Sequence, residues 1–153
     1  MKFDELLSVE RIAVSKKRQT KERLLEDMVG LFIECKAVSE QDKILPDILQ
    51  RESIISTGIG GGVAVPHIRK AYIQGVQSAF AINKVPVEYG SMDGEPVTFS
   101  IMILANSEDH EAYLRAVAKF AGLLHDSEAK EKLLKAESAD EVMTVLLHFE
   151  KTH

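Results

Sequence analysis

The residues best suited to chemistry lie together in one stretch, STGIGGGVAVPHIR, which spans residues 56–69. Four glycines fall within five positions, and a short apolar run, a proline and His67 follow them. Three interpretations are open: a glycine-rich loop that binds a phosphate, a plain turn into a strand, or the support of a reactive histidine. The neutral form of an imidazole, whose ordinary pKa is about 6.5, is a competent nucleophile near neutral pH.

The nucleotide-binding interpretation fails on spacing. A dinucleotide fingerprint requires glycines at offsets of zero, two and five residues, and from Gly58 the third would fall on Val63. A P-loop requires a Gly-Lys-Ser/Thr triplet, and a serine hydrolase requires a motif such as Gly-x-Ser-x-Gly; neither occurs. No His-x-x-x-His pair with nearby carboxylates indicates a metal site. We therefore expect no cofactor and no metal.

The reactive-histidine interpretation depends on the apolar run Val63–Val65, which predicts a short strand. Proline cannot donate to a strand ladder, so we expect the chain to leave the sheet at Pro66 and to present His67 at a strand end. Reactive groups commonly lie at such positions in α/β folds. The alternative is a plain surface or turn histidine. His125 and His148 are weaker candidates, because each falls late in a predicted helix, where a cation suits the helix dipole.

Elements of both kinds surround this stretch. Apolar residues at helical spacing predict a helix after Thr20 and a second one after residue 39, in which Pro46 marks a delayed start or a kink. Helix N-caps are predicted at Thr20, Ser39, Ser107, Ser127 and Ser138, and strands at residues 77–83 and 97–105. We therefore expect one α/β domain over residues 1–153, with a mixed sheet of about five strands and helices on both faces.

The composition excludes several classes of protein. A formal net charge of −5 provides no basic surface for nucleic acid. Cys35 is the only cysteine, which excludes an internal disulfide and a cysteine-based zinc cluster. The N-terminus lacks the apolar core of a signal peptide, and no apolar run approaches the roughly 20 residues that span a bilayer. We expect a soluble, cytoplasmic protein without membrane insertion.

Several segments together resemble the enzyme IIA domains of the phosphotransferase system, type 2, which is the fructose, mannitol and nitrogen-regulatory group. The segments are Arg51-Glu52, Ser56–Gly60, Gly62–His67, Pro86–Val97, Tyr113–Leu124 and Glu141-Val142. They extend over nearly the whole chain, and the order of loop, strand, proline and histidine is specific. The resemblance implies an α/β sandwich and a phosphoryl group carried on Nε2 of His67.

The resemblance also implies roles for residues around His67. Arg51 is expected to supply positive charge to the phosphoryl group; the alternative is a surface charge paired with Glu52. The expected phosphoryl loop consists of Ser56, Thr57, Gly58, Gly60, Gly61 and Gly62. The N–H groups of its glycines face the phosphoryl group, or else the glycines form only a mobile turn.

Two departures from the family pattern stand near the site. The family usually has a second histidine where this chain has Tyr113, and His110 precedes it by one helical turn. Three hypotheses follow: the Tyr113 hydroxyl donates to the phosphoryl group, His110 replaces the missing histidine, or phosphotransfer is weakened or lost. Ile68 stands where many members have glycine, which narrows access to His67 or offers an apolar docking contact.

The leading functional hypothesis is a phosphocarrier that receives a phosphoryl group from an HPr-like carrier protein. It would pass the group to a IIB domain or signal to a regulatory target by its phosphorylation state, with the nitrogen-regulatory type favoured. The alternatives are the free-standing IIA subunit of a sugar permease, an interaction module of the same fold without phosphotransfer, and a small α/β enzyme acting on a phosphorylated metabolite.

Overall fold

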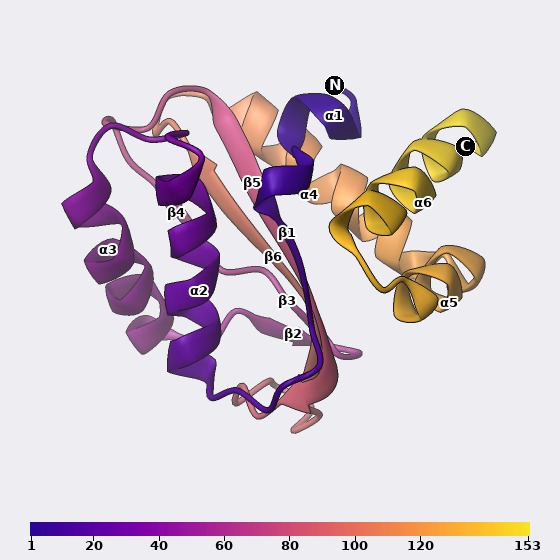
Figure 1. The fold of residues 1–153 in the computed structure, drawn as a ribbon. Coiled ribbons are helices and arrows are strands. Elements are labelled where there is room, and N and C mark those ends of the chain that lie inside the picture. Colours follow the sequence, from indigo (N-terminus) through magenta and orange to yellow (C-terminus); the bar gives the residue numbers. More distant parts are fainter.

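A six-stranded mixed sheet lies between two layers of helices (Figure 1). The computed structural model describes residues 1–153. The helices are α1 (Phe3–Leu6), the 3-10 helix η1 (Val9–Arg11), α2 (Lys21–Glu34), α3 (Gln41–Ile54), α4 (His110–His125), α5 (Ser127–Lys135) and α6 (Ala139–Thr152). The strands are β1 (Ile12–Ser15), β2 (Gly58–Gly60), β3 (Val63–Ala64), β4 (His67–Arg69), β5 (Val76–Val87) and β6 (Val97–Ala105). The predicted α/β class is confirmed, with six strands where about five were expected.

The antiparallel pair β5 and β6 forms the centre of the sheet. The strand order is β1-β5-β6-β3-β2, and β4 also pairs with β6. β6 has the predicted bounds and is buried except at Thr98, as expected for an apolar strand that is covered on both faces. β3 and β4 follow one another along β6 and run parallel to it, with Val63 opposite Phe99 and His67 opposite Ile103.

The prediction that the chain leaves the sheet at Pro66 is wrong. Pro66 has no N–H to donate, but its carbonyl accepts the N–H of Ile103 at 3.0 Å. The ladder therefore continues past the proline, and residues His67–Arg69 form β4. His67 is the first residue of a strand, which fixes its backbone in the sheet.

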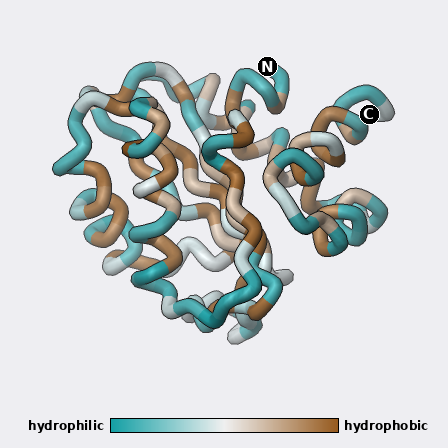
Figure 2. The backbone as a smooth tube through the Cα atoms, in the orientation of Figure 1, coloured by the Kyte–Doolittle hydropathy of each residue, from teal (hydrophilic) through white to brown (hydrophobic).

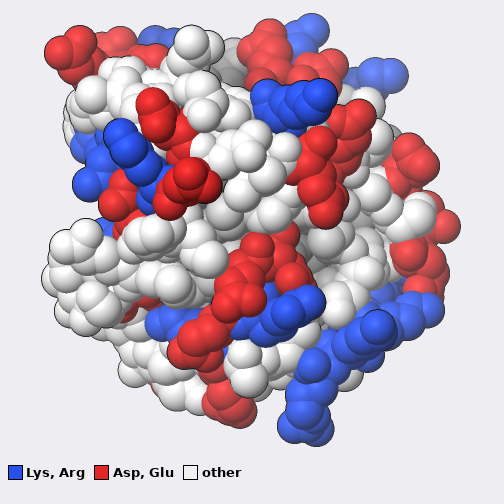
Figure 3. Space-filling view, turned by 60° about the vertical axis from the view of Figure 1, so that its left-hand side comes forward, with Lys and Arg blue, Asp and Glu red and all other residues white.

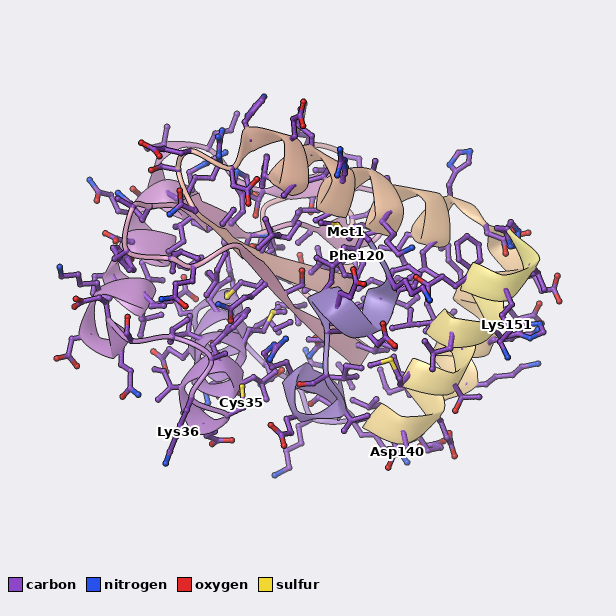
Figure 4. The ribbon with its side chains drawn as sticks, turned by 90° about the horizontal axis from the view of Figure 1, so that it is seen from above. Met1, Cys35, Lys36, Phe120, Asp140 and Lys151 are labelled. Atoms are coloured by element: carbon purple, nitrogen blue, oxygen red, sulfur yellow. The ribbon has the colours of Figure 1, made fainter.

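Each face of the sheet has its own apolar core. One core lies against α1, α4, α5 and α6, and the other lies against α2 and α3. In the first core the rings of Phe80 and Phe120 meet with centroids 6.2 Å apart. Figure 2 shows hydrophobic segments along the strands and on the helices around them. Seen from above, the end of α2, at Cys35 and Lys36, lies on the other side of the strands from α6, at Asp140 (Figure 4).

The predicted helix N-caps are confirmed in part. Thr20 and Ser138 cap α2 and α6, and each hydroxyl accepts the third N–H of its helix. The other three caps are wrong, because α3, α4 and α5 begin after Glu40, Asp109 and Asp126. At α5 the carboxylate of Asp126 accepts the N–H of Ala129 at 2.9 Å, so the cap lies one residue earlier than predicted.

Pro46 lies inside α3, five residues after the first helical residue, so the predicted delayed start is wrong. Proline removes the hydrogen bond to the carbonyl four residues earlier, that of Asp42. Both residues are exposed, so water can bind the freed carbonyl. The helix therefore tolerates the proline at this position.

The surface mixes charges of both signs. On the face drawn in Figure 3, acidic and basic side chains neighbour one another among uncharged ones. None of the helices has the length and apolarity that a bilayer span requires.

Candidate functional site

The imidazole of His67 is held by its own strand. Its Nδ1 lies 2.8 Å from the carbonyl oxygen of Val65. A carbonyl oxygen can only accept, so Nδ1 carries the proton and donates it. The other ring nitrogen, Nε2, is left with a lone pair, and this is the nitrogen that can act as a nucleophile or a base.

The surroundings keep this ring neutral. Burial lowers the pKa of His67 below its ordinary 6.5, and the positive charges of Arg51 and Arg69 lower it further. The hydrogen bond to Val65 and the charge of Glu52 act in the opposite direction without cancelling the effect. His67 therefore has a free nucleophilic nitrogen at neutral pH.

Arg51 reaches the site from the last turn of α3. Its Nη1 donates to the carbonyl of Ile55 at 3.1 Å. The segment after Ile55 runs antiparallel to the strand of His67, since the N–H of Val65 donates to the carbonyl of Thr57 at 3.0 Å. This pairing carries Ile55, and the guanidinium bound to it, toward His67.

Tyr113 contacts His67 from the opposite helical layer. The two ring centroids lie 5.7 Å apart, with the rings inclined by 45°. Burial raises the pKa of Tyr113, so its hydroxyl stays protonated. His110 is the first residue of α4 and is exposed. Of the two residues considered for this position, the structure brings Tyr113 to His67.

Arg69 also belongs to this site, and the sequence analysis missed it. It follows His67 by two residues in β4, so both side chains leave the same face of the strand. Its Cζ lies 5.1 Å from the centroid of the Tyr113 ring, and its Nη2 donates to the carbonyl of Ser107 at 3.3 Å. The alternation of a strand would have revealed it, had the strand not been predicted to stop at Pro66.

The surface-charge alternative required an ion pair between Arg51 and Glu52, and the structure does not contain one. Glu52 is buried, at 8% exposure, and accepts from Lys21 at 2.9 Å and from the Tyr89 hydroxyl at 2.8 Å. The hydroxyl and the N–H of Thr57 also donate to it. Burial alone would raise the pKa of Glu52, but these hydrogen bonds outweigh it and lower the pKa. The network ties the glycine stretch to the end of α3.

Backbone N–H groups of this stretch are used in hydrogen bonds within the protein. The N–H groups of Thr57, Gly58 and Gly61 donate to Glu52, to the Ser56 hydroxyl and to Asp93. Gly60, Gly61 and Gly62 have φ values of 94°, 65° and 78°, which form the turn from β2 to β3 and favour glycine.

This turn is distant from His67. The carbonyl of Gly62 accepts from Phe99, four residues before Ile103, the partner of His67. At roughly 3.3 Å per residue the separation along β6 is about 13 Å. The structure therefore does not bring Gly60, Gly61 and Gly62 to His67, whereas Ser56 lies in the segment that approaches it.

The assembled site joins a neutral imidazole to two guanidinium groups and a tyrosine. Exposed apolar side chains lie beside it in the sequence: Ile54 and Ile55 after Arg51, at 75% and 58% exposure, and Leu114 after Tyr113, at 50%. No group of three or more His, Cys, Asp or Glu side chains lies close enough to hold a metal ion. Such a site suits attack by Nε2 on an anionic group, with positive charge to receive it.

Comparisons with known proteins agree with this chemistry. The family model described as phosphoenolpyruvate-dependent sugar phosphotransferase system, EIIA 2, matches residues 5–149. The chain is 33% identical over 141 residues to the fructose-specific EIIA component of Haloferax volcanii, and the match covers 90% of each protein. It is 32% identical over 151 residues to the fructose-specific EIIABC component of Bacillus subtilis, covering 99% of this chain but 24% of that protein. The crystal structure of the nitrogen regulatory protein IIA-Ntr from Neisseria meningitidis gives a TM-score of 0.83 at 29% identity, covering 94% of this chain and 98% of that one.

Proposed function

Because the chain belongs to the EIIA type 2 family of the phosphoenolpyruvate-dependent sugar phosphotransferase system, we propose that it is a phosphocarrier, with residues 1–153 as one IIA domain. His67 accepts a phosphoryl group from a phosphorylated HPr-like carrier protein and passes it on. The hydrogen bond between Nδ1 of His67 and the carbonyl of Val65 carries this proposal, because it leaves Nε2 as the nucleophile.

The transfer exchanges one N–P bond for another. The lone pair on Nε2 of His67 attacks the phosphorus of the carrier's phosphohistidine, and the bond to the carrier's imidazole breaks with its electron pair returning to that ring. His67 keeps the proton on Nδ1, so its ring becomes positively charged. The Val65 carbonyl, which accepts that N–H, stabilises the new charge. The Arg51 guanidinium attracts the phosphoryl oxygens as they approach.

The apolar side chains around the site supply a docking surface for the carrier. Ile54, Ile55 and Leu114 are at least half exposed; Ile54 ends α3, Ile55 follows it, and Leu114 lies in α4, so they adjoin the two helices that provide Arg51 and Tyr113. A small apolar surface around charged groups suits a partner that must bind and leave within one transfer.

We propose the nitrogen-regulatory type in particular, on the likeness to IIA-Ntr. The specific observation that favours the second candidate, the IIA subunit of a sugar permease, is the 33% identity to a fructose-specific EIIA component. A purified fructose-type IIB domain separates the two. If it takes the phosphoryl group from this chain as fast as from its own IIA partner, the permease assignment replaces the nitrogen-regulatory one.

The phosphocarrier proposal is tested by incubating the protein with phosphoenolpyruvate, enzyme I and an HPr-like carrier. We expect an acid-labile, base-stable phosphate that is absent from His67→Ala. His110→Ala, a change outside the assembled site, serves as the control and is expected to label normally. No labelling with a carrier that phosphorylates another IIA protein would refute the proposal and favour the non-phosphorylating interaction module.

A further inference from the structure

One N–H of a charged side chain in the site lacks a hydrogen-bond partner. The Nε atom of Arg69 is buried, and its N–H has no acceptor. A buried polar group without a partner is costly and uncommon in folded proteins, and it is more costly when the group is charged. This donor therefore requires an explanation that the folded chain alone does not provide.

The rest of the guanidinium is held in place. Its face lies over the Tyr113 ring, at 5.1 Å from Cζ to the centroid, and Nη2 is bound to the carbonyl of Ser107 at 3.3 Å. The same tyrosine ring lies against His67, with centroids 5.7 Å apart. His67, Tyr113 and Arg69 thus form one contiguous group, and within it the Nε–H of Arg69 is the buried donor that has no acceptor.

The positive charges of Arg51 and Arg69 have no negative partner within the protein. Neither Arg51 nor Arg69 forms an ion pair, although ten ion pairs occur elsewhere in the protein. The positive charges of both arginines lower the pKa of His67, and Arg69 contacts the same tyrosine ring that lies against the imidazole. Two unpaired guanidinium groups beside one nucleophile suit a dianion, and planar guanidinium is well matched to phosphoryl oxygens.

We propose that Arg69, seated on the ring of Tyr113, binds the phosphoryl group on His67 through its Nε–H. The inference rests on the proposed phosphocarrier function. Arg69 takes no part in the bond exchange and neither gains nor loses a proton; it donates to a phosphoryl oxygen. Tyr113 is a positioning residue that acts through the face of its ring, and its hydroxyl is not needed.

The rate of phosphoryl transfer from the carrier to His67, measured in a single turnover, tests this assignment. Arg69→Gln is expected to slow transfer roughly 10- to 100-fold, the effect expected from loss of one hydrogen bond to a charged group. Arg69→Lys keeps the charge but not the planar fork, and is expected to restore part of the rate. Lys70→Gln removes an exposed charge one residue away, on the opposite side of the strand, and is the matched control with an unchanged rate.

Tyr113 can act through its ring or through its hydroxyl, and the two roles predict different transfer rates for its variants. Tyr113→Phe keeps the aromatic seat and is expected to transfer within about twofold of the original rate, whereas Tyr113→Leu falls toward the rate of Arg69→Gln. The double variant Arg69→Gln/Tyr113→Leu is then expected to be no slower than Arg69→Gln alone, because both changes remove the same contact between Arg69 and Tyr113. A transfer rate in Tyr113→Phe as low as that in Arg69→Gln would contradict the positioning of Arg69 by the tyrosine ring and would assign the role to the hydroxyl.

A second measurement does not depend on the carrier. Phosphoramidate phosphorylates histidine chemically, and the Arg69 Nε–H can be followed by NMR before and after treatment. We expect its resonance to shift on phosphorylation, and to stay in place in His67→Ala. An unchanged resonance in phosphorylated protein, or a full transfer rate in Arg69→Gln, overturns the inference while leaving the phosphocarrier function intact. Failure of the carrier to label the unaltered protein counts against that function alone.

Discussion

His67 donates its Nδ1 proton to the carbonyl two residues before it, and this one bond decides which ring nitrogen can react. The acceptor is a backbone carbonyl between β3 and β4, so the bond depends on no other side chain. The resemblance implied phosphorylation at Nε2, and the hydrogen bond supplies a physical reason for that choice. The identity of the residues around His67 then sets its charge and what it can bind.

The titration of His67 gives the first prediction. Its midpoint, followed by NMR, is expected to lie below 6.5, because burial and then the two arginines disfavour the charged ring. In Arg51→Gln the midpoint is expected to rise, since one positive charge is gone. Arg115→Gln, which removes an exposed arginine paired with Glu111 on α4, is the control. A midpoint in Arg51→Gln equal to that of the unaltered protein would count against the placement of Arg51.

The sign of the effect on stability follows from the lowered pKa. The folded protein binds the His67 proton less readily than the unfolded chain does, so unfolding takes up a proton in this pH range. The contribution of His67 to stability is therefore complete above pH 6.5 and is lost as the pH falls from there toward the folded-state pKa.

Among the helices and strands, the long ones and the short strand at Val63–Val65 were predicted, whereas the short strands β1, β2 and β4 were not. Thr20 and the apolar spacing after it identified α2, and continuous hydrophobicity identified β6. β1 and β4 have only four and three residues, and each exists because a long neighbour pairs with it. Pairing between distant residues leaves no local pattern in the sequence, so both strands were missed, and Arg69 with them.

The site shows the same division. His67 was predicted from its place after the apolar run and Pro66, whereas Arg51 and Tyr113 were predicted from the positions that correspond to them in the family pattern. The partners of Glu52 come from residues 21, 57 and 89, which only the folded chain brings together. A buried carboxylate in an adjacent Arg-Glu pair looks in the sequence like a surface charge.

The Glu52 network gives the second prediction, which concerns how the elements are joined. Glu52→Gln leaves the partly buried Lys21 ammonium without its counter-charge and is expected to lower the free energy of unfolding by about 2–4 kcal/mol. Urea denaturation measures this. Glu137→Gln breaks an exposed ion pair with Lys16 and is the control, which is expected to leave the free energy of unfolding nearly unchanged.

The pH dependence of that difference is also fixed in sign. The pKa of Glu52 is lowered from 4.5 in the folded protein, so its contribution is present above pH 4.5 and is lost as the pH falls through the folded-state pKa. The gap between the original protein and Glu52→Gln should therefore narrow in acid. A gap that is constant from neutral pH to strong acid would contradict the network.

Close packing at the start of the glycine stretch gives the third prediction. A Cβ on Gly58 would lie 2.2 Å from the hydroxyl oxygen of Ser91 and 3.0 Å from its Cα. Gly58→Ala is thus expected to destabilise the protein by about 1–3 kcal/mol in urea denaturation, and Ser91→Gly is expected to recover part of the loss. Gly30→Ala, in open space on α2, is the control and should not destabilise. Equal stability of the two alanine variants would contradict the contact.

The molecule as a whole creates the site by closing two helical layers on one edge of a sheet. α3 brings Arg51 from one layer, α4 brings Tyr113 from the other, and β4 lies between them with a partner on one side only. No part of the chain could form this arrangement alone. The same two helices carry exposed apolar side chains next to their site residues in the sequence: Ile54, three residues after Arg51, and Leu114, directly after Tyr113.

These exposed side chains give the fourth prediction. Ile54→Ser is expected to raise the KM for the phosphorylated carrier several-fold with little change in kcat, because the side chain is 75% exposed and contributes to docking rather than to chemistry. Leu134→Ser, at 45% exposure on α5, is the matched control on another helix. Equal KM values for the two variants, with both folded, would argue against a docking surface at the end of α3.

The incorporation of His67 into β4 has one more consequence. Carrier proteins often move a reactive group between stations on a flexible arm, but this histidine is hydrogen-bonded into a sheet and stays where it is. In the proposed function, the donor and acceptor proteins must therefore come to His67. Donor and acceptor have to occupy the same small area in turn, so one must depart before the other arrives. In the proposed function, donor and acceptor proteins therefore bind alternately to this one surface, and their competition for it, rather than movement of His67, sets the order of events.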